Sequence, residues 1–131
     1  MASPTPGVPR RIIVTDEDRA AVAFIIKTLR EDGHEVFHAY DALAAGQLAV
    51  AIPRIDLVIS NTKVEGADGL QVMRQLRRTR PEVPILYLAN TGRSTPEIEA
   101  ELPDGVPILR EPFTVERLRA AVDQLLDGKG K

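Results

Sequence analysis

Short runs of β-branched and other apolar residues alternate along this chain with segments that repeat apolar residues at helical spacing. The strand candidates are residues 11–15, 35–39, 55–60, 84–88 and 107–110. Runs that are apolar almost throughout are typical of parallel strands buried on both faces. The pattern therefore predicts an α/β fold with helices on both sides of one sheet.

Three of the intervening segments are predicted to be helices by their periodicity. Their inward-facing residues are Val22, Ile25, Ile26 and Leu29 in the first, Ala45, Leu48, Ala49 and Ile52 in the second, and Leu70, Met73 and Leu76 in the third. Gly33 ends the first helix and Pro53 the second, because glycine favours helix C-termini and a residue before proline disfavours helical geometry.

Two further helices follow. Thr95 and Pro96 predict the start of a short fourth helix, since a hydroxyl caps the first turn and proline suits its first position. Pro103 ends this helix after about two turns. A fifth helix begins at Thr114, and its inner face is formed by Val115, Leu118, Val122 and Leu125.

Strands that alternate with helices in this way fit a flavodoxin-like, doubly wound, five-stranded parallel sheet of order 2-1-3-4-5. Right-handed crossover connections leave few other topologies. In such sheets the functional crevice lies at the carboxyl ends of the strands, where the winding direction changes between strands one and three. The polar residues that follow the strands are therefore the candidates for function.

Length and composition limit the alternatives. A chain of 131 residues suits one domain, which we place at residues 10–127, between a disordered lead-in of residues 1–9 and a frayed tail of residues 128–131. The net charge of −2 gives no electrostatic reason to expect nucleic-acid or membrane binding. No apolar run approaches the roughly 20 residues of a membrane span. The absence of cysteine excludes disulfides and thiolate metal sites. A cytoplasmic location is expected by default.

Three motifs occur in order along residues 10–127. Asp16-Glu17 follows the first strand, residues 56–61 end the third strand ahead of Asp68-Gly69, and residues 111–113 precede the last helix. Together they resemble the response-regulator receiver domains of two-component signalling. The resemblance implies that the acidic pair and an aspartate after strand three hold a magnesium ion. It also implies that this aspartate accepts a phosphoryl group, which a hydroxyl after strand four and a lysine after strand five then bind.

Three positions depart from that pattern. Asn61 stands where the acceptor aspartate belongs, and an amide oxygen is a far poorer nucleophile than a carboxylate. Ala89 replaces the hydroxyl, and Glu111 replaces the lysine. Two unit charges about 4 Å apart interact by roughly 4 kcal/mol at an effective dielectric near 20, so the glutamate would repel a phosphoryl group. We therefore expect a degenerate phosphorylation site.

The charge of the crevice leaves two hypotheses open. Asp16, Glu17 and the carbonyl of Asn61 are candidate ligands for a magnesium ion, although the two acids would equally favour the start of the next helix. Alternatively, Lys63 or Arg110 supplies an internal cation, and Lys63 is the better candidate because it lies two residues after Asn61. We favour the internal cation and expect no cofactor to be required. A solvated Lys63 that points outward is the third possibility.

The resemblance also implies a switch and a partner surface. The last strand of a receiver usually carries an aromatic residue three positions before the lysine, and that residue swings inward on activation; here Ile108 occupies this place. Receivers commonly bind protein partners through helix four, strand five and helix five, which correspond to residues 95–102, 108–110 and 114–126. Arg74, Arg77, Arg78 and Arg80 form a basic stretch that is expected to be a solvated face.

The first hypothesis is accordingly a stand-alone, degenerate receiver that is not an enzyme and signals through protein contacts, with pairing of two copies left open. The alternative is a receiver that accepts phosphate from a histidine kinase at another carboxylate, such as Glu65 or Asp68. A flavodoxin-like nucleotide or flavin binder is disfavoured, because no glycine-rich phosphate loop follows the first strand.

Overall fold

The computed structural model describes residues 9–15, 19–39, 42–60, 63–64, 67–89 and 94–128. Its main sheet has five parallel strands in the order β2-β1-β3-β6-β7. These strands are β1 (Arg11–Thr15), β2 (Glu35–Ala39), β3 (Leu57–Ser60), β6 (Ile85–Ala89) and β7 (Ile108–Arg110). In chain order this is the arrangement 2-1-3-4-5, so the predicted flavodoxin-like fold is confirmed.

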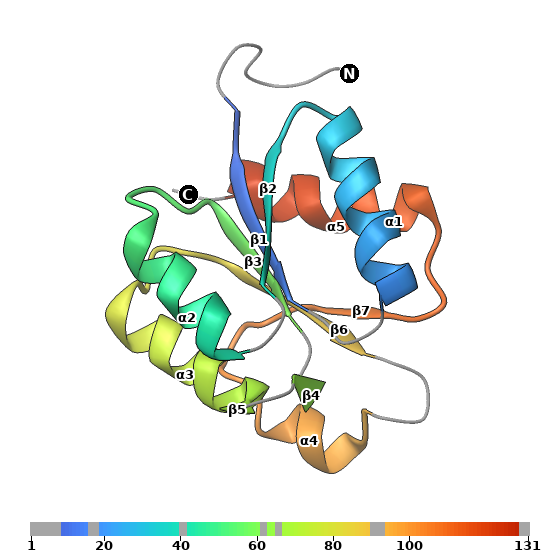
Figure 1. The fold of residues 1–131 in the computed structure, drawn as a ribbon. Coiled ribbons are helices and arrows are strands. Elements are labelled where there is room, and N and C mark those ends of the chain that lie inside the picture. The colour runs from blue at the N-terminus through green and yellow to red at the C-terminus, as the bar shows by residue number, and fades with distance from the viewer. Residues whose placement is uncertain are drawn as a thin grey trace.

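Helices cover both faces of the sheet (Figure 1). They are α1 (Arg19–Glu31), α2 (Ala42–Ala51), α3 (Gly69–Thr79), α4 (Pro96–Ala100) and α5 (Val115–Gly128). One apolar cluster joins the sheet to α1 and α5, and a second joins it to α2 and α3. Successive residues of β1 alternate between them: Ile12 and Val14 face the first cluster and Ile13 faces the second.

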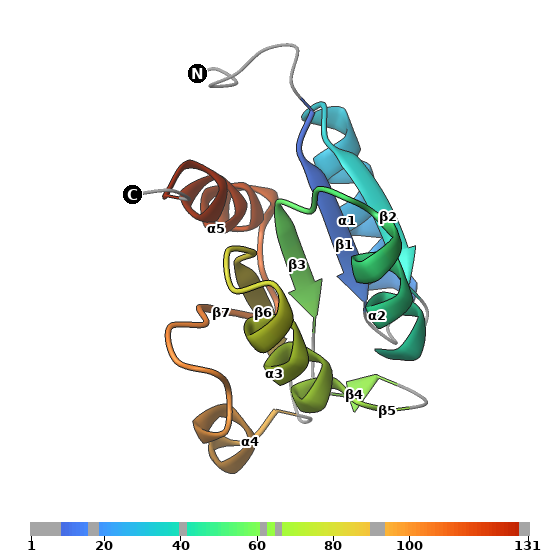
Figure 2. The ribbon, with the colours of Figure 1, turned by 90° about the vertical axis from the view of Figure 1, so that its left-hand side faces the viewer.

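The short helix α4 lies at the end of the molecule where the strands finish, as does the antiparallel hairpin of β4 (Lys63–Val64) and β5 (Ala67–Asp68) (Figure 2). The hairpin was not predicted, because strands of two residues are too short to show an alternating pattern. The predicted start of α4 is confirmed, since the Thr95 side chain accepts a hydrogen bond from the backbone N–H of Ile98. The helix is shorter than expected, with five residues.

Two other details differ from the prediction. The third strand begins at Leu57, two residues later than expected. Asp56, just before it, is bound to Arg11 of β1 twice: its backbone N–H donates to the Arg11 carbonyl at 2.8 Å, and its Oδ2 accepts the backbone N–H of Arg11 at 2.8 Å. In α5 the fully buried residues are Leu118, Val122 and Leu126, at intervals of four, whereas Leu125 is only partly buried. The predicted inner face was thus one residue off at its end.

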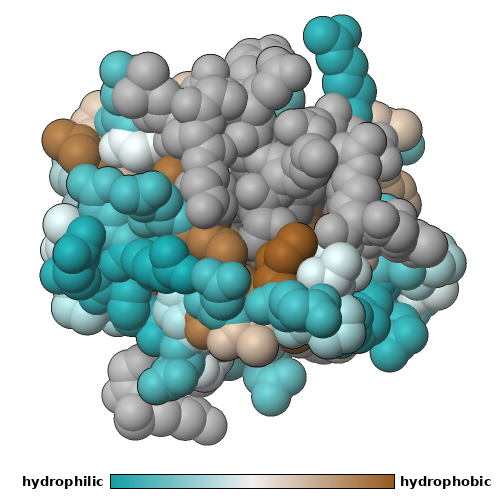
Figure 3. All heavy atoms as spheres, turned by 90° about the horizontal axis from the view of Figure 1, so that it is seen from below, coloured by the Kyte–Doolittle hydropathy of each residue, from teal (hydrophilic) through white to brown (hydrophobic). Residues whose placement is uncertain are grey.

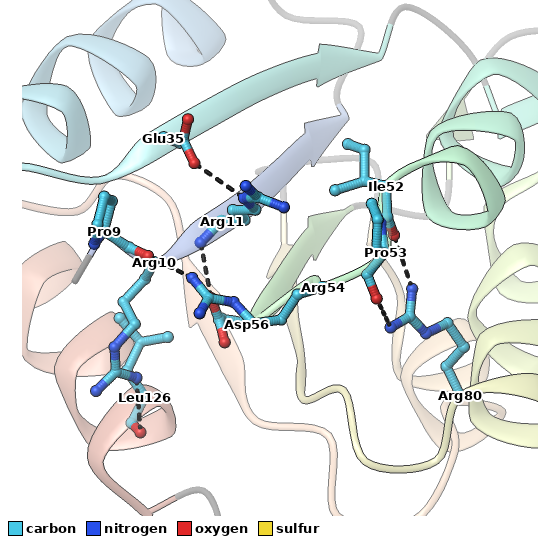
Figure 4. A network of polar contacts seen from close by, with 10 residues as sticks. All are labelled: Pro9, Arg10, Arg11, Glu35, Ile52, Pro53, Arg54, Asp56, Arg80 and Leu126. Carbon is cyan, nitrogen blue, oxygen red and sulfur yellow. Dashed lines mark hydrogen bonds and ion pairs between the residues drawn. The ribbon is translucent and has the colours of Figure 1, made fainter.

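The opposite end of the sheet is closed by arginines that bind backbone carbonyls (Figure 4). Arg80 donates from Nη1 to the carbonyls of Ala49 and Ile52 and from Nη2 to that of Pro53. Ala49 lies in the last turn of α2, where carbonyls lack partners within the helix, and Ile52 and Pro53 follow that helix in the chain. The expectation of a solvated basic face is therefore wrong for Arg80, which holds the C-terminal end of α3 against that of α2.

None of the helices within the described ranges is long and apolar enough to cross a membrane.

Candidate functional site

The carboxyl ends of β1 and β3 meet at the centre of the predicted crevice. Thr15 and Ser60 are register partners, and each is only 1% exposed. Asp16, Glu17 and Asn61 directly follow these two residues in the sequence and lie outside the described residues. Figure 3 views this end of the molecule, and its coloured atoms are mostly hydrophilic with small hydrophobic areas between them.

The structure describes part of the predicted cation site. The backbone of Lys63 lies in β4 opposite Asp68, but its side chain is outside the description. Within the described part of the chain, no group of three or more histidine, aspartate or glutamate side chains could hold a metal ion. By their chemistry, the carboxylates of Asp16 and Glu17 and the amide oxygen of Asn61 suit a hard cation. Whether a metal or Lys63 balances them stays a prediction.

Ala89 and Glu111 lie at the ends of β6 and β7, as predicted from the sequence. Ala89 is buried in the cluster under α2 and α3, and its carbonyl accepts the backbone N–H of Glu111 at 3.0 Å. Glu111 is itself half-buried. The strand end that would carry a hydroxyl therefore carries a methyl group, and the neighbouring residue is an acid.

Arg110 is directed to α4. Its Nη2 and Nη1 donate to Oε1 and Oε2 of Glu99 at 2.6 and 2.9 Å, which makes a two-bond guanidinium–carboxylate pair. This pairing disfavours Arg110 as the internal cation of the crevice, whose acidic residues Asp16 and Glu17 lie outside the described residues. Successive strand residues point to opposite faces, so Arg110 and Glu111 do not share one direction.

Glu99 also binds two hydroxyl groups in series. Ser94 Oγ donates to Glu99 Oε2 at 2.7 Å and lies 2.6 Å from the hydroxyl oxygen of Tyr87. Because Ser94 has one proton and gives it to Glu99, Tyr87 is the donor in the second bond. We call Tyr87, Ser94, Glu99 and Arg110 the Glu99 network.

The predicted switch position lies next to this network. Ile108 is 37% exposed on the edge strand β7 and is the register partner of Tyr87 on β6. Tyr87 is 1% exposed, so its ring is enclosed while its hydroxyl reaches Ser94. An aromatic residue is thus present beside the switch position, but on the neighbouring strand.

Two arginines of the predicted basic face hold the far side of α4. Arg74 pairs with Glu101 at 3.1 Å, and Arg77 donates to the backbone carbonyl of Asp104 at 2.8 Å. Both arginines belong to α3, and both acceptors lie in the segment that leaves α4. Of the four arginines, Arg74 and Arg78 are exposed as predicted, although Arg74 is paired with Glu101.

The Glu99 network was not predicted from the sequence. One signal was available: a tyrosine inside the apolar run of β6 needs a partner for its hydroxyl when it is buried. The partners Glu99 and Arg110 are 11 residues apart in different elements, so spacing gave no indication of their contact.

The network shifts the pKa of its charged members. The hydrogen bonds from Arg110 first, and then from Ser94, lower the pKa of Glu99 below its ordinary value of 4.5. The carboxylate in turn raises the pKa of Arg110. A lowered folded-state pKa stabilises the fold above the unfolded value, and this contribution is lost as the pH falls through the folded value.

We predict that the side-chain carboxyl signal of Glu99 titrates below pH 4.5 in a carbon-detected NMR titration. In Arg110→Gln the midpoint should rise, because the largest cause of the lowered pKa is removed. Arg117→Gln, in which an exposed arginine of α5 is neutralised, is the matched control and should leave the midpoint unchanged. An equal midpoint in the wild type and Arg110→Gln would contradict the observed pairing.

Known proteins share this fold and sequence. The model of the response regulator receiver domain matches residues 12–123. The response regulator MprA of Mycobacterium sp. strain KMS is 39% identical over 121 residues, which cover 91% of this chain and 51% of that protein. For MprA of Mycolicibacterium vanbaalenii the identity is 38% over 132 residues, or 95% and 56% of the two chains. The chain therefore spans about half the length of these curated relatives.

Solved structures agree with this result. A response regulator receiver protein from Sinorhizobium medicae WSM419 superposes with a TM-score of 0.82 at 26% identity, covering 92% of this chain and 97% of that one. A signal receiver domain of an HD domain-containing protein from Pseudomonas fluorescens Pf-5 gives a TM-score of 0.85 over 98% and 95% of the chains, and at 20% identity it shows the fold alone. Receiver domains are signalling modules of two-component systems, and this chain belongs to the response regulator receiver domain family.

Proposed function

We propose that this chain is a receiver that signals through protein contacts without forming an aspartyl phosphate. The observation that supports this most is the set of residues after three strands: Asn61, Ala89 and Glu111. Asn61 lacks the carboxylate that attacks phosphorus. Ala89 offers no hydroxyl to the transferred group, and Glu111 places a negative charge where the resemblance implies a positive one.

The proposed partner surface is formed by α4, β7 and α5. Ile108 and Arg110 are exposed on the edge strand, and Glu97 and Ala100 are exposed on α4. The partner is a protein of a signalling pathway, and a second copy of this chain is one candidate. We do not propose nucleic-acid binding for this chain. About half the length of each curated relative lies outside the region that matches this chain, and functions of that half are not carried over to it.

The proposal predicts that the wild type gains no phosphoryl group from acetyl phosphate and magnesium, as measured by intact-protein mass spectrometry. Asn61→Asp alone should be modified poorly, because Glu111 still repels the incoming anion. The triple variant Asn61→Asp, Ala89→Thr, Glu111→Lys should be modified at least about tenfold faster than Asn61→Asp, since replacing a repulsive by an attractive charge is worth more than about 1.4 kcal/mol.

Stoichiometric modification of the wild type would contradict the proposal. Mapping of the modified peptide to Glu65 or Asp68 would then support a non-standard acceptor. Modification of the triple variant at position 61 would show that the altered residues, and not the fold, prevent the reaction.

We further propose that the ammonium group of Lys63 balances the acidic pair, so that no metal is required. Calorimetric titration of the wild type with magnesium should then show no binding at micromolar concentrations. Lys63→Met should bind more tightly, because the acidic pair loses its internal cation. Lys27→Met, which removes an exposed lysine of α1, is the control and should behave as the wild type. Micromolar binding by the wild type would support the metal hypothesis instead.

The partner surface predicts where a photo-cross-linking amino acid will capture a protein in the source cell. Incorporation at Ala100 of α4 should give discrete cross-linked species, whereas incorporation at the equally exposed Gln47 of α2 should not. The mass of the product separates a second copy from another protein. Cross-links at Gln47 with none at Ala100 would contradict the proposed surface and indicate that the partner binds at α2.

A further inference from the structure

We propose that the Glu99 network is a permanent lock that fixes α4 in one position without any change at the crevice. This inference depends on the proposed function only in assuming that a protein partner binds the α4 surface. The lock itself is a property of the folded chain and is tested without a partner.

The helix α4 cannot keep its position by its own stability. It has five residues and no buried residue, and isolated helices need about 12–15 residues even to be marginally stable in water. Its apolar contact with the core is made by Ile98, which is only partly buried. The polar contacts must therefore decide where the helix lies.

Those contacts bind the helix to two strands of the sheet. Glu99 accepts two hydrogen bonds from Arg110 of β7 and one from Ser94, which in turn accepts the hydroxyl of Tyr87 from β6. Glu99 is only 14% exposed, whereas Arg110 is 63% exposed. Two-bond pairs between arginine and carboxylate fix geometry as well as supplying energy. One carboxylate thus joins α4 to β6 and β7 together.

The third side of α4 is held independently. Arg74 and Arg77 of α3 bind Glu101 and the carbonyl of Asp104, which lie in the segment after the helix. The start of the helix has its own cap at Thr95. The helix is therefore held at its middle by the sheet and at its exit by α3.

Tyr87 makes the arrangement difficult to reverse. Its ring is buried between β6 and the α2–α3 core, and rotation would remove the hydroxyl from Ser94. A buried hydroxyl without a partner is unfavourable. The register partner Ile108 has no polar group that could take its place.

The test is amide hydrogen exchange of α4, followed by NMR on the whole chain at neutral pH. We expect Glu99→Gln and Arg110→Gln each to speed exchange of the Glu99 and Glu101 amides by about three- to tenfold, as for a lost charged hydrogen bond at a partly exposed site. The double variant should exchange no faster than the faster single variant, because both remove the same pair. Tyr87→Phe and Ser94→Ala should give smaller increases in the same amides.

The controls separate the lock from general destabilisation. Glu97→Gln changes an exposed acid of the same helix and should leave exchange nearly unchanged. Amides of α5 report global unfolding and should speed up by no more than the α4 amides do, because the lost contact lowers the free energy of global unfolding as well. Equal α4 exchange in the wild type, Glu99→Gln and Arg110→Gln would overturn the lock and leave the proposed function standing. Phosphorylation of the wild type would refute the proposed function without altering this exchange result.

Discussion

The parallel alignment of five strands is the constraint on which the rest of the structure depends. It brings the carboxyl ends of β1, β3, β6 and β7 to one edge, so single residues far apart in the sequence become neighbours there. Thr15 and Ser60 are register partners for this reason, and the N–H of Glu111 reaches the carbonyl of Ala89. The chemistry available at that edge is consequently set by very few side chains.

In this chain, side chains of β6 and β7 hold the helix α4 in place. Tyr87 and Arg110 both direct their polar groups to the Ser94–Glu99 pair, while Ala89 beside them has no polar side chain. Both terminal nitrogens of Arg110 donate to Glu99, so the positive charge at the end of β7 is used to fix α4.

The sequence predicted the fold almost completely, because burial on both faces gives apolar strands and helical spacing marks what covers them. It also located Ala89, Glu111 and Ile108, since strand ends follow directly from strand positions. It did not predict the contact of Arg110 with Glu99, which depends on the direction of one side chain, or the β4–β5 hairpin, which has too few residues to show periodicity. Contacts between short or distant segments leave no periodic signal.

A receiver transmits a signal only if a ligand binds two conformations with different free energies. On the proposed function, the amide at residue 61 and the acid at residue 111 leave an anion in the crevice with no conformation to favour. A partner then meets α4 in the one position that the Glu99 network fixes, and Arg110, at 63% exposure, contributes a positive charge to that surface. On the proposed function, regulation of the α4 surface then resides in the binding partner.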